Sequence, residues 1–275
     1  MGAGMTSHTK MLDIMDLFTD EQFAWTIEDM AERLGYTRST LYRYLRELVD
    51  AGFLTALPEI GYTPGPRIIE LEALIQRKDP LIQASRPFMV ELVGEFGGFS
   101  ALCRSYGQQV MCVHHEYGTT PIVSGYAKGA VSPLLLGSAS RTILAHWPAA
   151  TLQKLYRVHK EAFAAAGLGE DLEGVKASLR SIRQKGWDVT FGQVTRGVAG
   201  IAAPILDGRQ NILGSLSVVV QRQSLETGQI EAIADKLTFC ARTITRTLGE
   251  RAGDAPAPKV RPGRSLVRSK QVVAL

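Results

Sequence analysis

The chain of 275 residues has only three cysteines and no apolar run long enough to cross a bilayer. Because a membrane-spanning helix needs about 20 mostly apolar residues, we expect no membrane segment. The amino-terminal residues lack the charged-then-apolar pattern of a signal peptide. Cys103, Cys112 and Cys240 are odd in number and widely spaced, which is typical of reduced, buried thiols rather than a disulfide framework. We therefore expect a cytoplasmic protein.

The short motifs of several enzyme classes are also missing. The sequence has no Gly-x-x-x-x-Gly-Lys-Ser/Thr phosphate loop, no Gly-x-Gly-x-x-Gly after a strand and no Gly-x-Ser-x-Gly turn. Cys112 and His114 alternate onto one face of a predicted strand, but no third and fourth ligand follow at zinc-site spacing. Packing, or a pocket-lining role for His114, is the simpler interpretation. We expect no metal, no cofactor and no enzymatic activity.

The net charge of +4 is unevenly distributed along the chain. Residues 251–275 hold six Lys and Arg against Asp254 alone, whereas residues 1–65 hold ten Asp and Glu against five Lys and Arg. Bulk charge therefore does not predict nucleic-acid binding, and the argument depends on where the cations lie. The basic tail could attract DNA without regard to sequence, or it could be only a solubilising end.

One amphipathic helix is predicted between Thr37, a suitable N-cap, and Gly52, a suitable stop. An apolar stripe at i, i+4 and i+7 consists of Leu41, Leu45 and Leu48. The opposite face has no carboxylate and carries Ser39, Tyr42, Arg43 and Arg46. Such a face can bind DNA, although a helical hairpin with solvated arginines would show the same pattern.

The neighbouring segments favour a helix-turn-helix. Thr26 and Asp29 resemble a capping box at the start of a helix over 27–34, and Gly35 turns the chain into the next helix. Residues 53–57 and 62–63 predict a small hairpin, or wing, and residues 24–26 a short strand that pairs with it. With a helix over 10–18, residues 10–65 are predicted to form a winged helix-turn-helix domain after a disordered segment, 1–9.

The rest of the chain predicts a linker helix over 66–79, an α+β domain on an antiparallel sheet over 80–249, and a disordered basic tail over 250–275. Within the α+β domain the expected strands are 99–105, 110–115, 121–126, 187–191, 198–206 and 212–221. The expected helices are 80–96, 138–146, 148–160, 172–185 and 225–248. Pro87 is expected to kink the first helix or delimit a turn, and 162–169 is expected to be a loop.

Four segments in this order resemble the IclR family of bacterial transcriptional regulators. They are the recognition-helix pattern from Gly35 to Gly52, the wing end from Gly61 to Arg67, the Gly-to-Pro-Leu segment from Gly129 to Ala145, and the effector-domain core from Ile182 to Val218. The resemblance covers residues 10–248. It implies a GAF-like C-terminal domain that binds a small metabolite, commonly an organic acid, and dimers or dimers of dimers on promoter DNA.

Candidate site residues follow from the helix face and from the resemblance. For DNA they are Thr37, Arg38, Ser39, Thr40, Tyr42, Arg43, Arg46 and Tyr62. Arginine can grip guanine through two hydrogen bonds or hold a phosphate, while Tyr62 could equally pack beneath the wing. The pocket walls implied by the resemblance are Leu136, Ser138, Ala139, Thr190, Val198, Gly200, Ser217 and Val219.

The chain departs from the family pattern at this pocket. Family members commonly have an acid where Thr190 stands and a cysteine where Gly200 stands, often acids at Gly192 and Gln193, and a glycine at Ser140. Loss of a carboxylate and a thiol predicts a roomier, less negative pocket. Such a pocket would admit an anion larger than glyoxylate or pyruvate, with an aromatic carboxylate as one candidate.

The predicted function is a homo-oligomeric regulator whose affinity for an approximately palindromic operator in double-stranded DNA responds to this effector. Two alternatives remain open at this point. One is a DNA-binding assembly factor with a vestigial sensor domain that no longer needs an effector. The other is an enzyme with an appended winged helix.

Overall fold

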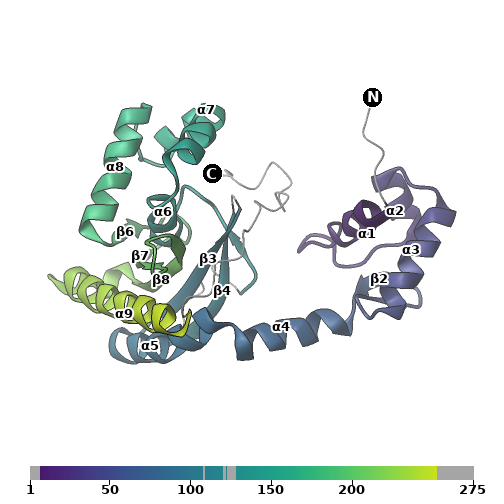
Figure 1. Ribbon diagram of the computed structural model, residues 1–275, viewed down its shortest axis with the longest axis horizontal. Coiled ribbons are helices and arrows are strands. Elements are labelled where there is room, and N and C mark those ends of the chain that lie inside the picture. The colour runs from purple at the N-terminus through teal and green to yellow at the C-terminus, as the bar shows by residue number, and fades with distance from the viewer. Residues whose placement is uncertain (1–6, 108, 120–121, 123–127, 253–275) are drawn as a thin grey trace. The chain divides into compact units, whose positions relative to one another are not determined.

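The computed structural model describes residues 7–107, 109–119, 122 and 128–252. The chain divides into two compact units, residues 1–78 and 79–275 (Figure 1). Parts of three predicted segments lie outside the described residues. They are 1–6 of the segment 1–9, all of 121–126 except Ile122, and 253–275 of the segment 250–275.

The first unit is a helix-turn-helix followed by a two-stranded wing and a linker helix. Its elements are α1 (Ser7–Met15), α2 (Ile27–Leu34), α3 (Arg38–Asp50), β1 (Leu54–Leu57), β2 (Gly61–Pro64) and α4 (Pro66–Lys78). The wing is antiparallel, and the predicted strand at 24–26 is present as a single bridge between Trp25 and Tyr62. The predicted winged helix-turn-helix is therefore confirmed, with α1 shifted toward the amino terminus.

Local chemistry sets the ends of α2 and α3. The Thr26 hydroxyl accepts a hydrogen bond from the Asp29 backbone N–H at 3.2 Å, and the Thr37 hydroxyl accepts one from the Thr40 N–H at 3.3 Å. Both are N-cap bonds. Gly35 ends α2 with a φ of 68°, a conformation that glycine adopts without steric cost.

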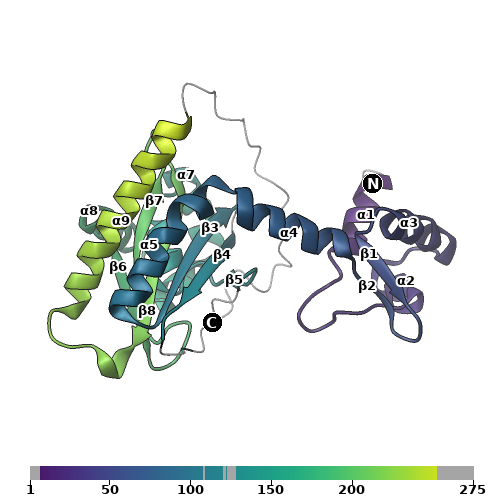
Figure 2. The ribbon, with the colours of Figure 1, turned by 90° about the horizontal axis from the view of Figure 1, so that it is seen from below.

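The second unit is a six-stranded antiparallel sheet between two layers of helices (Figures 1 and 2). The strand order is β5-β4-β3-β8-β7-β6. The strands are β3 (Phe99–Tyr106), β4 (Gln109–Tyr117), β5 (Val131–Ser132), β6 (Asp188–Phe191), β7 (Val198–Leu206) and β8 (Ile212–Gln221). One face packs against α5 (Pro80–Phe96) and α9 (Gln229–Ala252), and the other carries α6 (Ser138–Leu144), α7 (Ala149–Ala165) and α8 (Leu172–Lys185).

Strand β7 shows how both faces of the sheet are buried. Ala199 and Ile201 are buried in the cluster under α5 and α9, whereas Val198 and Ala202 are buried in the cluster on the opposite side. Because successive side chains of a strand point to opposite faces, a strand buried on both faces is apolar throughout. The predicted α+β class and antiparallel sheet are confirmed.

Two predictions within this unit were wrong, and a third is narrowed. Of the two roles considered for Pro87, a turn is excluded, since α5 continues through it, and a kink stays a prediction; Pro87 is exposed, so water can bond the carbonyl that loses its partner. The chain from 162 to 165 is helical rather than a loop, because Phe163 is fully buried and holds this end of α7 in the core, beyond a break at His159. Helix α9 begins at Gln229 instead of Leu225, after a 3₁₀ turn (Arg222–Ser224) and Gly228.

The three cysteines are buried free thiols, as predicted. Among the described residues, no helix is both long and apolar enough to cross a membrane.

Candidate DNA-binding face and effector pocket

The outward face of α3 carries the polar residues that the sequence singled out. Arg38, Ser39, Tyr42, Arg43 and Arg46 are all exposed, with Tyr42 58% exposed despite its aromatic ring. The opposite face places Leu41, Leu45 and Leu48 in the core of the unit. The helix thus presents three guanidinium groups and no carboxylate between Arg38 and Arg46, in a position set by its buried face.

The three arginines have only weak partners within the described unit. Arg38 forms an ion pair with Glu28 at 3.2 Å, and Arg46 one with Asp50 at 3.8 Å. Exposed pairs of this kind contribute ~0–1 kcal/mol. Arg43 donates to the Tyr44 hydroxyl at 3.0 Å and lies 4.9 Å from the centre of its ring. These contacts can be exchanged for DNA at little cost.

The remaining DNA candidates take structural roles in this unit. Thr37 caps α3, and Thr40 is half-buried beside it. Tyr62 exchanges two backbone hydrogen bonds with Trp25, at 2.8 and 3.0 Å, and its ring packs against the core. Burial raises the pKa of Tyr62. Packing beneath the wing, the second role considered for Tyr62, accounts for these contacts.

The sequence did not reveal how the turn before α3 is held. The Tyr36 hydroxyl donates to an Asp13 carboxylate oxygen at 2.7 Å and so joins the turn to α1. Burial and this hydrogen bond raise the pKa of Tyr36 to about 12. Since 23 residues separate the partners, no local pattern could have paired them.

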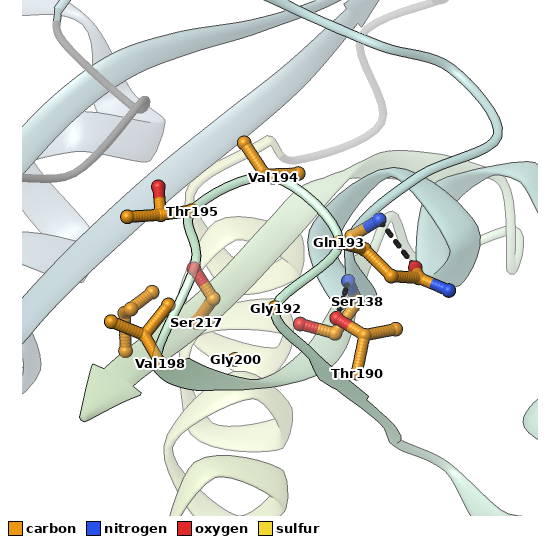
Figure 3. Close-up of a pocket in the computed structure, with 11 residues that line it drawn as sticks. Ser138, Thr190, Gly192, Gln193, Val194, Thr195, Val198, Gly200 and Ser217 are labelled. Atoms are coloured by element: carbon orange, nitrogen blue, oxygen red, sulfur yellow. Dashed lines mark hydrogen bonds between the residues drawn. The ribbon is translucent and has the colours of Figure 1, made fainter. Parts of the chain in front are cut away.

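A pocket lies on the α6 side of the sheet, and we call it the effector pocket (Figure 3). Its described walls come from the start of α6, from β6 to β8 and from the loop after β6. They are Gly137, Ser138, Thr190, Gly192, Gln193, Val194, Thr195, Val198, Gly200, Ser217 and Val219. Six of the eight predicted wall residues are among them. Leu136 and Ala139 are not; both pack in the adjacent apolar cluster.

Two hydrogen bonds fasten one wall of the effector pocket to another. The Ser138 N–H donates to the Thr190 hydroxyl and the Gly137 N–H donates to the Gln193 side-chain oxygen, each at 3.0 Å (Figure 3). The lining residues that the structure describes include no acidic or basic side chain. The described lining therefore offers hydroxyl groups and small apolar groups. The carboxylate that the family pattern would place there is absent.

The free space in this pocket is small. It amounts to about 20 Å³, room for roughly one water molecule. A Cβ added at Gly200 would lie 3.1 Å from the Ser138 hydroxyl, so Ser138 already occupies space that the missing side chain would leave. In this conformation the free space is smaller than the predicted larger anion needs.

The sequence analysis placed Gly192 and Gln193 at the pocket through the family pattern, but it missed Val194 and Thr195, because nothing in their local pattern shows that the loop crosses the pocket. Gly192 and Gly197 flank this loop with φ values of 63° and 80°. Both conformations favour glycine.

Cys112 and His114 make structural contacts with their own strand. The Cys112 thiol donates to the His114 carbonyl at 3.4 Å, and the His114 ring lies 3.1 Å from Glu116. In the part of the chain that the structure describes, no three metal-ligating side chains gather.

A winged helix-turn-helix with a cationic outward helix, joined in one chain to a sheet domain with a pocket, defines the class of DNA-binding transcriptional regulators. The comparisons with known proteins agree. The family model described as the IclR helix-turn-helix domain matches residues 7–58, and the bacterial transcriptional regulator IclR C-terminal model matches residues 73–246. The chain belongs to the IclR family of bacterial transcriptional regulators.

Individual relatives are similar over most of their length. The HTH-type transcriptional regulator KipR of Bacillus subtilis is 21% identical over 240 residues, 87% of this chain and 96% of that protein. The Pca regulon regulatory protein of Pseudomonas putida is 23% identical and shares 78% of this chain and 74% of its own. All of the relatives named in the comparison are transcriptional regulators, which argues against the enzyme alternative.

Solved structures show the same fold. The IclR regulator from Alicyclobacillus acidocaldarius matches with a TM-score of 0.74 at 20% identity, over 87% of this chain and 97% of that one. An IclR homolog from Microbacterium hydrocarbonoxydans, complexed with 4-hydroxybenzoate, matches with a TM-score of 0.73 at 19% identity, over 90% and 100%.

Proposed function

We propose that this regulator binds an approximately palindromic operator as a homodimer or dimer of dimers, in the cytoplasm, and that a small organic acid in the effector pocket changes its operator affinity. In this proposal α3 enters the major groove. Arg38, Arg43 and Arg46 then read base edges or hold phosphates. Two copies related by symmetry read two half-sites.

The observation that carries the DNA part is the outward face of α3. Its guanidinium groups are exposed and weakly paired, while its apolar face is locked in the core. A rigid helix with exchangeable cations loses little conformational freedom when it binds. Most charged side chains in the rest of this unit are acidic, and they repel phosphates and so favour an orientation in which α3 faces the DNA.

The effector part rests on the chemistry of the pocket. Ser138 and Thr190 supply polar groups, and Val198 and Val219 supply an apolar wall. The carboxylate of an aromatic acid would contact the polar groups, and its ring would contact the apolar wall. The Microbacterium relative with 4-hydroxybenzoate bound supports an aromatic acid as the first ligand to test.

Such a ligand requires the pocket to open, since about 20 Å³ cannot hold a benzoate ring. The loop from Gly192 to Gly197 is the part to move. In the middle of the loop the Gln193 side chain accepts from the Gly137 N–H, and one such hydrogen bond contributes ~0.5–1.5 kcal/mol. The bonds at its two ends, from the Gly192 N–H to the Val198 carbonyl and from the Arg222 N–H to the Gly197 carbonyl, can remain while the middle moves. Opening is therefore within the reach of ligand binding.

The closed pocket also favours the second candidate function, a regulator whose sensor domain serves assembly alone. Thermal unfolding separates the two. We would measure the melting temperature with 4-hydroxybenzoate, benzoate, pyruvate and glyoxylate, together with binding to the DNA upstream of the regulator's own gene. A ligand that binds the folded state raises the melting temperature by mass action; no rise with any of these acids would favour the assembly role.

Ser217→Leu supplies the matched variant. Its larger side chain fills the pocket and should abolish the thermal shift and the effector response. Unchanged DNA binding without effector would show that the variant folds. A normal response in this variant would mean that the effector binds elsewhere.

A further inference from the structure

A second and larger cavity lies at the free edge of β7, and we call it the basic groove. Its free space is about 550 Å³, within the range of small-molecule sites. It is lined by His146, Arg183, Gly186, Ala203, Pro204, Leu206, Gln210, Thr238, Ala241, Arg242 and Thr245. None of these residues lines the effector pocket.

The groove exists because β6 is shorter than β7. Their pairing runs from Phe191↔Ala199 to Asp188↔Ala202, so residues 203–206 of β7 have no strand beside them on that edge. Residues after α6, at the end of α8 and along α9 surround the exposed edge instead. The Leu206 N–H is bonded by the Thr245 hydroxyl at 3.1 Å, which shows one way that α9 covers this edge.

The charge in the groove has one sign. Arg183 and Arg242 contribute two guanidinium groups, and no Asp or Glu is among the lining residues that the structure describes. Arg183 donates to the Ala145 carbonyl at 2.9 Å. That bond fixes its direction and uses only one of the five N–H groups of a guanidinium.

The histidine in the groove is oriented as well. His146 Nδ1 lies 3.0 Å from the Thr142 carbonyl. A carbonyl can only accept, so Nδ1 carries the hydrogen and Nε2 is left for another partner. Burial, and the nearby charge of Arg183, lower the pKa of His146. In the neutral ring Nε2 can only accept, so its partner would be a hydroxyl group of a ligand.

A buried hydroxyl in the same wall lacks a partner. The Thr238 oxygen is covered from solvent and has no hydrogen-bond partner among the described residues. Such a group costs free energy unless something bonds it. Because this oxygen is covered, a ligand oxygen in the groove would bond it only after the Thr238 side chain turns toward the groove.

The geometry points to the basic groove as a binding site for a small metabolite with at least two negative charges, a phosphate ester or a di- or tricarboxylate. Its oxyanion is held by Arg183 and Arg242, and His146 Nε2 accepts a hydrogen bond from a hydroxyl group of the same ligand. Guanidinium groups suit this chemistry because they bind carboxylate and phosphate through parallel hydrogen bonds. This second site is separate from the effector pocket and does not rest on the function proposed for it.

Titration calorimetry on the full chain at low salt tests the assignment. The probes are inorganic phosphate, citrate, fructose 1,6-bisphosphate and uncharged fructose. We expect citrate or the bisphosphate to bind and fructose to fail. Tighter binding of citrate would indicate a carboxylate site, and tighter binding of the bisphosphate would indicate a phosphate site. Failure of all three anions, or equal binding of fructose, would overturn the proposal.

Variants locate the site. Arg242→Gln removes an exposed charge and should lower anion affinity by about tenfold or more, as loss of a charged hydrogen bond does. Arg180→Gln, an exposed cation of α8 outside the groove, is the matched control and should bind normally.

Ser217→Leu should also retain anion binding, because it alters only the effector pocket; loss there would refute two separate sites, whatever the effector result. An oligomeric state that changes in Arg242→Gln without any anion binding would instead make the groove a contact between copies.

Discussion

The contact between the wing and Trp25 makes a sharp prediction at Gly61. Its φ is 104°, and a Cβ placed there would lie 2.5 Å from the Trp25 carbonyl oxygen. Gly61→Ala therefore combines backbone strain, about 1–2 kcal/mol, with displacement of a carbonyl that accepts from the Tyr62 N–H at 2.8 Å, ~0.5–1.5 kcal/mol. We expect the first unit to lose roughly 1.5–3.5 kcal/mol in total.

Gly35 provides the control. Its φ is also positive, at 68°, but no atom lies within 4 Å of the position of an added Cβ. Gly35→Ala should therefore cost only the strain, about 1 kcal/mol.

Urea unfolding followed by Trp25 fluorescence measures both variants, in a Trp147→Phe, Trp187→Phe background that silences the other two tryptophans of the chain. Equal losses in Gly61→Ala and Gly35→Ala would refute the argument that the Trp25 carbonyl limits this position.

Three further predictions concern α3 and a half-buried histidine. Arg43→Ala should weaken operator binding by roughly 1–3 kcal/mol if Arg43 reads a base, while Arg180→Ala in the second unit should leave it unchanged in the same mobility-shift assay. Glu28→Gln should tighten DNA binding about two- to fivefold, because it frees Arg38 from its 3.2 Å partner and removes a charge that repels phosphate; weaker binding would contradict this. Burial lowers the pKa of His146 below 6.5, so the unfolded state binds more protons between the two values and the free energy of unfolding rises with pH there. Urea unfolding from about pH 5 to about pH 8 should show a shallower rise in His146→Gln, and an identical slope would exclude His146 as a source.

Local patterns were sufficient for the ends of α2 and α3 in the first unit. Thr26, Gly35 and Thr37 mark helix ends through contacts with near neighbours in the sequence, so their roles are visible without a fold. The same reasoning failed at Pro87 and Phe163, where exposure and burial decide the outcome. Burial is a property of the tertiary structure, and it overrides local propensity.

The sites show the same division. The residues on α3 share a helix face, which the spacing of the sequence alone reveals. The partners Gly137 and Gln193 are 56 residues apart, and the groove joins residues from His146 to Thr245. Only the antiparallel order of the strands brings such positions together. Most effector-pocket residues were named from family resemblance, whereas Val194 and Thr195 of the loop that closes the pocket were not.

Strand β7 contributes to both cavities. Val198 and Gly200 line the effector pocket near its beginning, and Ala203, Pro204 and Leu206 line the basic groove near its end. If occupants of the two cavities favour different settings of this shared wall, each changes the affinity for the other by the same factor. The nine residues of β7 would then couple the binding of two different metabolites, so that operator binding depends on the concentrations of both.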